Sequence, residues 1–257
     1  MIPVETHDVS VNLGNRWVVD HANLELHQGE MVGLIGPNGA GKSTLMKTIA
    51  GLQFYQKGVV SVLGKEVFAS YHSTLAKDVA YLPQSHEVHW PLTVRRVVAL
   101  GRLPYLQPWQ KLSAADDALV DEAMQEADVA HLADRSIHEL AGGERTLTLI
   151  ARVLANQSQI ILADEPVAGL DPNHQIQVMQ LLRERAGNKK TVLVVLHDLA
   201  LAARFCHKLY LIHKGKILAA GEPKKVLSPE NLAASYHIEA KYSPDPDEFY
   251  VLPWKKI

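Results

Sequence analysis

Hydrophobic and polar residues alternate through much of the first third of the chain. The alternation is clearest in HDVSVNL (7–13), NLELHQGE (23–30) and VVSVLGKEV (59–67). A period of two is typical of strands with one buried face, and the glycines between these segments favour turns. We therefore expect a largely antiparallel sheet in this region.

A short apolar run, GEMVGLIG (29–36), interrupts this alternation. It leads into a glycine-rich loop and then into KSTLMKTIAGL (42–52), a segment with helical spacing that ends at Gly51. The pattern predicts a strand, a loop and a helix in immediate succession.

From residue 86 to residue 157 the pattern is helical, and AADDALVDEAMQEADVAHLA (114–133) is its clearest amphipathic piece. Strands and helices alternate again in QIILADEP (159–166), NHQIQVMQLLRERAG (173–187) and KTVLVVLHD (190–198). This alternation is typical of an α/β fold. We interpret 1–257 as one domain, in which a helical subdomain, 86–157, is inserted into an α/β core with a β subdomain and a C-terminal extension, 1–85 and 158–257.

Composition narrows the class of protein. The 257 residues are 47% hydrophobic and 21% charged, which argues against extensive disorder, and the net charge of −2 provides no basic field for nucleic acid. The single cysteine, Cys206, excludes an internal disulfide framework and fits a reducing compartment. The start MIPVETHDVS lacks the basic and apolar regions of a signal peptide, and no segment has the roughly 20 apolar residues of a membrane span. We expect a cytoplasmic protein.

The loop after the apolar run carries the first candidate chemistry. GPNGAGKST (36–44) fits the phosphate-binding pattern G-x-x-x-x-G-K-[ST] and lies between a predicted strand and a predicted helix. Backbone amides and the positive end of the helix would converge there on a polyphosphate. We expect Lys42 to reach the terminal phosphates and Ser43 to hold a magnesium ion. The predicted nucleotide-binding residues are Gly36, Pro37, Asn38, Gly39, Ala40, Gly41, Lys42, Ser43 and Thr44.

Two carboxylates, Asp164 and Glu165, end the apolar strand of IILADEP. From the carboxyl end of a neighbouring strand they could reach the phosphate loop, with Asp164 binding magnesium and Glu165 activating the attacking water. By itself such a pair is an ordinary acidic strand end, and the phosphate loop is what favours the functional interpretation. His197, after another apolar strand, and Gln84, at the end of VAYLPQ, are unremarkable by themselves.

Together these motifs resemble the ATP-binding cassette (ABC) family, the ATPase subunits of membrane transporters. The order along the chain matches that family: the phosphate loop, Gln84 in the glutamine loop, LAGGE (140–144) in the signature motif, ILADEP (161–166), AGLD (168–171) and His197 as the switch histidine. The resemblance implies a P-loop NTPase (RecA-like) core with an antiparallel β subdomain and an inserted helical signature subdomain. It also implies that ATP and Mg²⁺ are the cofactors.

The resemblance further implies a division of roles within a homodimer packed head to tail. The catalytic residues would be Glu165, His197, Lys42 and Gln84, and the metal site would be Ser43, Gln84 and Asp164. The signature residues Ala141, Gly142, Gly143 and Glu144 would face the γ-phosphate bound by the second subunit, and Asp171 would link the two sites.

The chain also departs from the family. Ala141 stands where serine is usual, Thr146 and Leu147 stand where glutamine and arginine are frequent, and Leu13 stands where an aromatic usually stacks on adenine. Trp17 could replace that aromatic or could be a packing residue of the sheet.

Two segments, TVRRVVALGRLPY (93–105) and 195–236, resemble the importers of iron chelates, haem and vitamin B12. That resemblance implies two integral-membrane permease subunits, contacted by residues 86–110, and indirectly a substrate-binding protein. The ATPase would lie on the cytoplasmic face of the inner membrane.

Other interpretations stay open at this point. A soluble, non-transport ABC ATPase of the iron-sulfur assembly type would share all the core motifs. A catalytically silent ATP-binding scaffold would explain Ala141, although the intact Lys42, Asp164 and Glu165 argue against it. The segment SHEVHW, with His86 and His89, fits no common metal-binding spacing, and a metal site there is not favoured.

Overall fold

The alternating segments at the start of the chain form an antiparallel sheet. The computed structural model describes residues 1–68, 72–84, 90–243 and 249–257. The sheet has the strand order β2-β1-β4-β5, with β1 Val4–Leu13, β2 Arg16–Leu26, β4 Lys57–Val62 and β5 Lys65–Glu66. Val9, Val11 and Val19 are fully buried, and the antiparallel sheet predicted for this region is confirmed. The alternation itself is interrupted in β1, because Ser10 between the two valines is also buried and the pairing with β2 shifts register there.

A second, mostly parallel sheet is built from the short apolar runs. Its strand order is β10-β9-β3-β8-β7-β6. The bounds are β3 Met31–Ile35, β6 Val79–Leu82, β7 Ile160–Asp164, β8 Thr191–Val195, β9 Lys208–His213 and β10 Lys216–Gly221. Every residue of β3, β7 and β8 is buried, which explains why these strands have no polar alternation. Because β3, β7 and β8 are parallel neighbours, their carboxyl ends lie along one edge.

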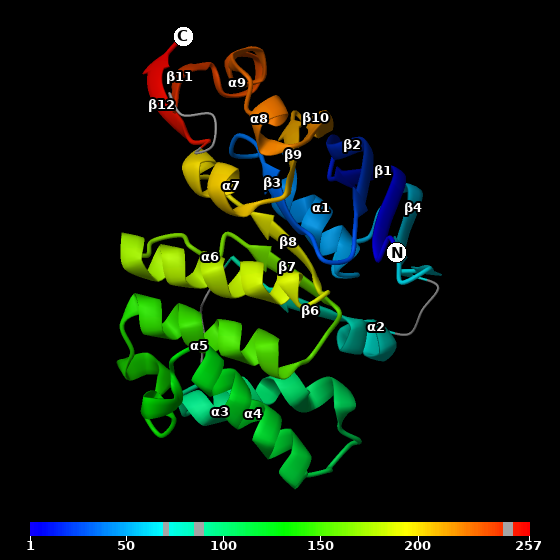
Figure 1. Ribbon diagram of the computed structural model, residues 1–257. Coiled ribbons are helices and arrows are strands. Elements are labelled where there is room, and N and C mark those ends of the chain that lie inside the picture. The colour runs from blue at the N-terminus through cyan, green and yellow to red at the C-terminus, as the bar shows by residue number, and fades with distance from the viewer. Residues whose placement is uncertain (69–71, 85–89, 244–248) are drawn as a thin grey trace.

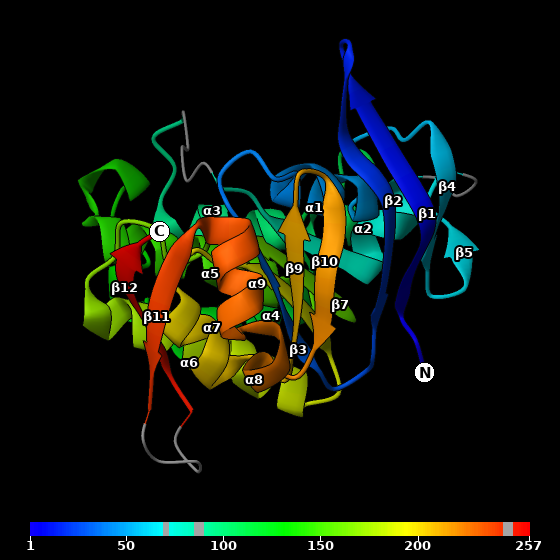
Figure 2. The same cartoon turned by 90° about the horizontal axis from the view of Figure 1, so that it is seen from above.

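Helices cover this second sheet, as Figures 1 and 2 show. Those of the α/β part are α1 Lys42–Ile49, α2 His72–Asp78, α6 Pro172–Gly187, α7 Leu199–Phe205, α8 Pro223–Val226 and α9 Pro229–Tyr236. The chain closes with a hairpin of β11 Ile238–Tyr242 and β12 Val251–Lys256, which packs beside α7. The fully buried Val251 anchors the hairpin to the core.

The middle of the chain is helical and lies at the bottom of Figure 1. It contains α3 Val94–Ala99, α4 Ala114–Glu126, α5 Gly142–Ala155 and the 3-10 helices η1 Leu100–Tyr105, η2 Ala130–Leu132 and η3 Ile137–Glu139. These helices share one apolar core with β7, β8 and α6. A buried ion pair, Arg102 Nε to Asp116 Oδ1 at 2.9 Å, ties η1 to α4.

The amphipathic segment 114–133 does not form one continuous helix. Helix α4 stops at Glu126 because Asp128 adopts a left-handed conformation, with φ of 56°. The amides of Asp128 and Val129 then donate to the carbonyls of Gln125 and Met124, which closes the last turn and directs Val129 into the core.

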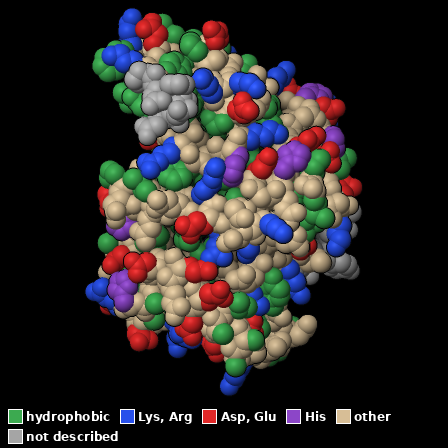
Figure 3. All heavy atoms as spheres, in the orientation of Figure 1, with side chains coloured by type: hydrophobic (Ala, Val, Ile, Leu, Met, Phe, Trp, Pro, Cys, Tyr) green, Lys and Arg blue, Asp and Glu red, His purple; other side chains and the backbone are tan. Residues whose placement is uncertain are grey.

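Charged side chains of both signs are interspersed on the face shown in Figure 3. This distribution agrees with the near-neutral net charge of −2. No helix within the described residues has the length and apolar character needed to cross a membrane.

Candidate nucleotide site

The phosphate loop joins β3 to α1 through a backbone path that glycine alone can follow. Gly36 and Gly41 have φ of 151° and 107°. A Cβ on Gly36 would lie 2.1 Å from the carbonyl oxygen of Ile212, and one on Gly41 would lie 2.5 Å from that of Val18. The loop is therefore pressed against β9 and β2. No side chain caps the amino end of α1, so its first amides remain available to an anion.

Lys42 lies across this loop. Its Nζ donates to the carbonyl oxygens of Gly36, at 2.7 Å, and Pro37, at 3.0 Å. The residue is 5% exposed, and burial lowers the pKa of the ammonium while the nearby Glu165 and Asp164 act in the opposite direction. The ammonium of Lys42 therefore lies where the terminal phosphates of a bound nucleotide would meet the loop. Its hydrogen bonds to charged phosphate oxygens would be stronger than those that it makes to the two backbone carbonyls.

Asp164 ends β7 and faces α1. Its Oδ1 accepts a hydrogen bond from Ser43 Oγ at 3.0 Å, and its Oδ2 accepts one from Tyr81 OH at 3.3 Å. The residue is fully buried, and burial raises the pKa of its carboxyl against the opposing effect of these hydrogen bonds. The hydroxyl and carboxylate together form a set of hard oxygen donors, the kind that Mg²⁺ prefers.

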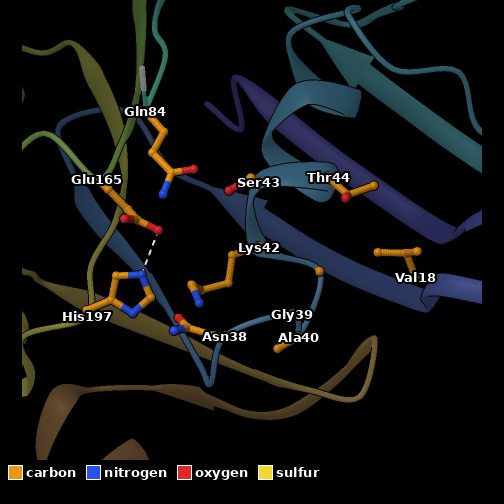
Figure 4. Close-up of a pocket in the computed structure, with 11 residues that line it drawn as sticks. Val18, Asn38, Gly39, Ala40, Lys42, Ser43, Thr44, Gln84, Glu165 and His197 are labelled. Atoms are coloured by element: carbon orange, nitrogen blue, oxygen red, sulfur yellow. Dashed lines mark hydrogen bonds and ion pairs between the residues drawn. The ribbon is translucent and has the colours of Figure 1, made fainter. Parts of the chain in front are cut away.

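Glu165 and His197 meet on the open side of the same cleft (Figure 4). Glu165 has a φ of 53°, a left-handed turn that directs its side chain toward β8 rather than along β7. Its Oε1 lies 2.6 Å from Nε2 of His197, which follows β8. Positive φ at a non-glycine residue costs free energy, and such strain is concentrated at functional sites.

Lys42, Ser43, Glu165 and His197 line one cleft of about 700 Å³, whereas the buried Asp164 is not part of the lining and hydrogen-bonds to Ser43. Its lining residues are Val18, Asn38, Gly39, Ala40, Gly41, Lys42, Ser43, Thr44, Gln84, Glu165 and His197. Gln84 enters from beyond β6, opposite the phosphate loop (Figure 4). Trp17 is not among the lining residues, and its ring instead lies 5.1 Å from Nζ of Lys57. The predicted stacking of Trp17 on adenine therefore stays a prediction, and Val18 is the residue of β2 that faces the cleft.

The signature residues lie outside this cleft, at the amino end of α5. Ala141 is the N-cap, and its amide donates to Glu144 Oε2 at 3.0 Å. Alanine offers no oxygen in return, so only half of a reciprocal capping box is present. Gly142 and Ala141 are exposed, which leaves the first amides of α5 available to another molecule.

The two departures from the family that lie within α5 after the signature residues, Thr146 and Leu147, are accommodated within the chain. Thr146 is buried, and its Oγ1 donates to the carbonyl oxygen of Gly142 at 3.1 Å. Leu147 is buried in the core that α5 shares with its neighbours. Neither residue reaches the nucleotide cleft.

Asp171 likewise does not line the cleft. It is the N-cap of α6, where its Oδ1 accepts the amide of His174 at 3.1 Å and its Oδ2 lies 2.6 Å from His174 Nδ1. These hydrogen bonds lower the pKa of the Asp171 carboxyl. Within one chain, the carboxylate of Asp171 is therefore already hydrogen-bonded to the first turn of its own helix, α6.

Sequence reasoning missed Tyr81 and Val18. The available signal for Tyr81 was its position in the strand beside β7, where it pairs with Leu162, two residues before Asp164. Arg152 of α5 donates to the carbonyl oxygen of Tyr81 at 3.4 Å, which links the signature helix to the strand that leads to Gln84.

The histidines His86 and His89 lie outside the described residues. Within the part of the chain that the structure describes, no group of three or more His, Cys, Asp or Glu side chains is arranged to hold a metal ion.

Residues 19–168, more than half of the chain, match the family described as ABC transporter. This chain belongs to the ABC transporter family. The predicted fold, a P-loop NTPase with its two added subdomains, is that of the ABC ATPases and is confirmed.

Individual relatives agree along most of the chain. It is 39% identical to the hemin import ATP-binding protein HmuV of Bordetella avium, over 95% of this chain and 96% of that protein. It is 37% identical to the cobalamin import ATP-binding protein BtuD of Halobacterium salinarum over 93% of its own length, and it spans 60% of that longer protein. A solved inward-facing structure of a metal-chelate type ABC transporter superposes with a TM-score of 0.86 at 25% identity, covering 100% of this chain and 98% of the other.

Proposed function

We propose that this chain is the ATP-hydrolysing subunit of an importer for an iron chelate, haem or a cobalamin-like compound. The observation that carries the proposal is one cleft in which Lys42 and the Glu165–His197 pair meet the phosphate loop, with the buried Asp164 hydrogen-bonded to Ser43 of the lining. The cargo class rests on the similarity to hemin and cobalamin import subunits and to a metal-chelate transporter. A scaffold without activity has no need for the strained, hydrogen-bonded Glu165.

The residues at the cleft fit both cofactors of the proposal. The backbone amides of the phosphate loop and the ammonium of Lys42 would hold the phosphates of ATP. Ser43, Asp164 and Gln84 would hold Mg²⁺ directly or through water. Bound Mg²⁺ would neutralise the charge that develops on the phosphate oxygens.

The remaining chemistry belongs to the protein's own side chains. The carboxylate of Glu165 would orient the attacking water and accept its proton. His197 holds that carboxylate through the 2.6 Å contact, so it would keep the base in one orientation. The buried ammonium of Lys42 would stabilise charge on the terminal phosphate.

The proposal includes a homodimer with head-to-tail packing. The exposed amino end of α5 does not serve the cleft of its own chain. In a head-to-tail pair the amides of Gly142 and Gly143 would meet the γ-phosphate bound by the other copy, as helix amino ends commonly bind anions.

The proposal places this dimer on two permease subunits at the cytoplasmic face of the inner membrane, with a substrate-binding protein acting indirectly. Residues 90–110 follow Gln84 and carry exposed apolar side chains that include Trp90, 72% exposed, and Leu103, 56% exposed. Such apolar exposure favours a protein contact. Positions 86–89 of the predicted contact lie outside the described residues.

Crosslinking tests the permease contact. A photo-crosslinking residue at Leu103 should trap an integral-membrane protein with many spans, whereas the same residue at Leu218, 44% exposed on β10, should trap none. Capture of soluble proteins alone from Leu103 would overturn the importer proposal and favour an assembly ATPase.

A further inference from the structure

The amino end of α5 and the loop before α6 meet at the ring of His174. A Cβ built on Gly143 would lie 2.7 Å from Cδ2, 2.8 Å from Cγ and 2.8 Å from Nε2 of that imidazole. Contacts under about 3.0 Å do not occur for real Cβ atoms, so the ring occupies the space that a side chain at 143 would need. Helices α5 and α6 pack together, as Figure 1 shows.

The other side of the imidazole is held by Asp171. Nδ1 lies 2.6 Å from Asp171 Oδ2, and the backbone amide of His174 donates to Oδ1 of the same carboxylate at 3.1 Å. A carboxylate can only accept, so Nδ1 carries the proton. The side chain of His174 is 30% exposed, and both of its orienting contacts are made within the chain.

This arrangement explains how α5 tolerates alanine at its N-cap. An N-cap oxygen normally fixes the first turn of a helix, and Ala141 lacks one. The ring of His174 packs against that same turn at Gly143 and connects it to the loop containing Asp171. The two surfaces of the dimer proposed above are therefore joined through one side chain.

We propose that His174 is a positioning residue for ATP-dependent dimer closure. The ring of His174 holds the amino end of α5 at a fixed position relative to Asp171. The second copy would therefore meet one rigid surface, made of the amides of Gly142 and Gly143 and the loop that contains Asp171. The inference rests on the head-to-tail dimer of the proposed function. It assigns no contact between His174 and ATP.

The test uses full-length protein carrying Glu165→Gln, and measures the ATP concentration at half-maximal dimerisation by light scattering. His174→Ala should raise that concentration about tenfold, while the ATP affinity of the monomer changes less than about twofold, since the phosphate loop is untouched. His174→Asn, which retains a donor near the Nδ1 position, should recover part of the loss. His131→Ala, an exposed histidine on η2, is the matched control and should change neither value.

A second-site test distinguishes positioning from a loss of fold. Gly143→Ala should impair dimerisation far more than His174→Ala does, by roughly a hundredfold, because its methyl group would overlap the imidazole and displace the first turn of α5. In the double variant, Gly143→Ala with His174→Ala, the ring no longer occupies that space. Dimerisation of the double variant should therefore return to the level of the His174→Ala protein. A double variant no better than Gly143→Ala, or equal dimerisation by His174→Ala and its parent, would overturn the inference. If the Glu165→Gln parent itself forms no ATP-dependent dimer, the proposed function falls and the inference falls with it.

Discussion

Single side chains in the cleft separate nucleotide binding from hydrolysis. Glu165→Gln keeps an amide that can hydrogen-bond to His197, yet it removes the group that accepts a proton. We expect ATP binding to be retained and hydrolysis to fall about 10²- to 10⁴-fold, the usual contribution of a general base. Lys42→Ala should instead abolish binding, and Lys65→Ala, an exposed lysine on β5, serves as the control. Steady-state ATPase assays paired with equilibrium binding check both, and normal turnover by the Glu165→Gln protein would refute the assigned role.

At Asp164, the ionised carboxylate that the proposed function needs lowers the stability of the folded chain. Burial raises the pKa of its carboxyl above the usual 3.8, so the ionised form is the unfavourable one in the folded protein. The free energy of unfolding should therefore fall as pH rises through the interval between the ordinary and the raised pKa, since the folded state then holds more protons than the unfolded state.

Asp164→Asn removes that cost while it leaves an oxygen to accept from Ser43. At pH 7 and without nucleotide, we expect a gain of about 1 kcal/mol in the free energy of unfolding, or roughly 2 to 4 °C in Tm, together with loss of hydrolysis. Thermal unfolding checks this prediction. A lower Tm for the variant would show that the carboxylate is net stabilising in the folded chain.

At the scale of the elements, the first turn of α5 has no side-chain oxygen at its N-cap, Ala141. We expect a working but modest activity in the isolated subunit, with dimer closure rather than nucleotide binding as the weak step. A serine at 141 would supply both the missing cap, worth about 0.5 to 2 kcal/mol for a helix, and a donor for an anion.

Ala141→Ser should therefore raise hydrolysis, or lower the ATP concentration needed for dimerisation, and leave the monomer's affinity for ATP nearly unchanged. The comparison is made between Glu165→Gln proteins with alanine or serine at 141, titrated with ATP. Equal dimerisation would mean that the hydroxyl is dispensable, because another contact, such as the ring of His174, already holds the turn.

The local motifs were predictable because their chemistry depends on neighbours in the sequence. Gly36, Gly41 and Lys42 act through one loop, and the positive φ of the glycines follows from the loop itself. The end of α4 was not predictable in this way, because periodicity continues past Glu126 while Asp128 turns left-handed. On β2 a shift of one position exchanges the faces of a strand, which is why Val18 rather than Trp17 faces the cleft.

At the scale of the whole molecule, the contacts that sequence reasoning could not supply join elements far apart in the chain. Tyr81 reaches Asp164 only through the register of β6 on β7, and His174 reaches Gly143 only through the packing of α6 on α5. Spacing along one strand or helix carries no information about either pair. The separation of the signature residues from the cleft of their own chain is also a property of the whole fold.

Because the signature residues lie outside the cleft of their own chain, we expect hydrolysis to require head-to-tail closure of two copies, and a double-cysteine variant measures that closure. Cys206 is buried, 5% exposed, with a pKa raised to about 12, so it will not compete with engineered thiols. Cysteines replace the exposed Asn38 of the phosphate loop and the exposed Ala141 of the signature motif in the Glu165→Gln protein. With ATP and mild oxidant, we expect a disulfide-linked dimer from the double variant and from a mixture of the two single variants, but from neither single variant alone. Covalent dimers that form equally without ATP, or no dimer with it, would rule out ATP-dependent head-to-tail closure.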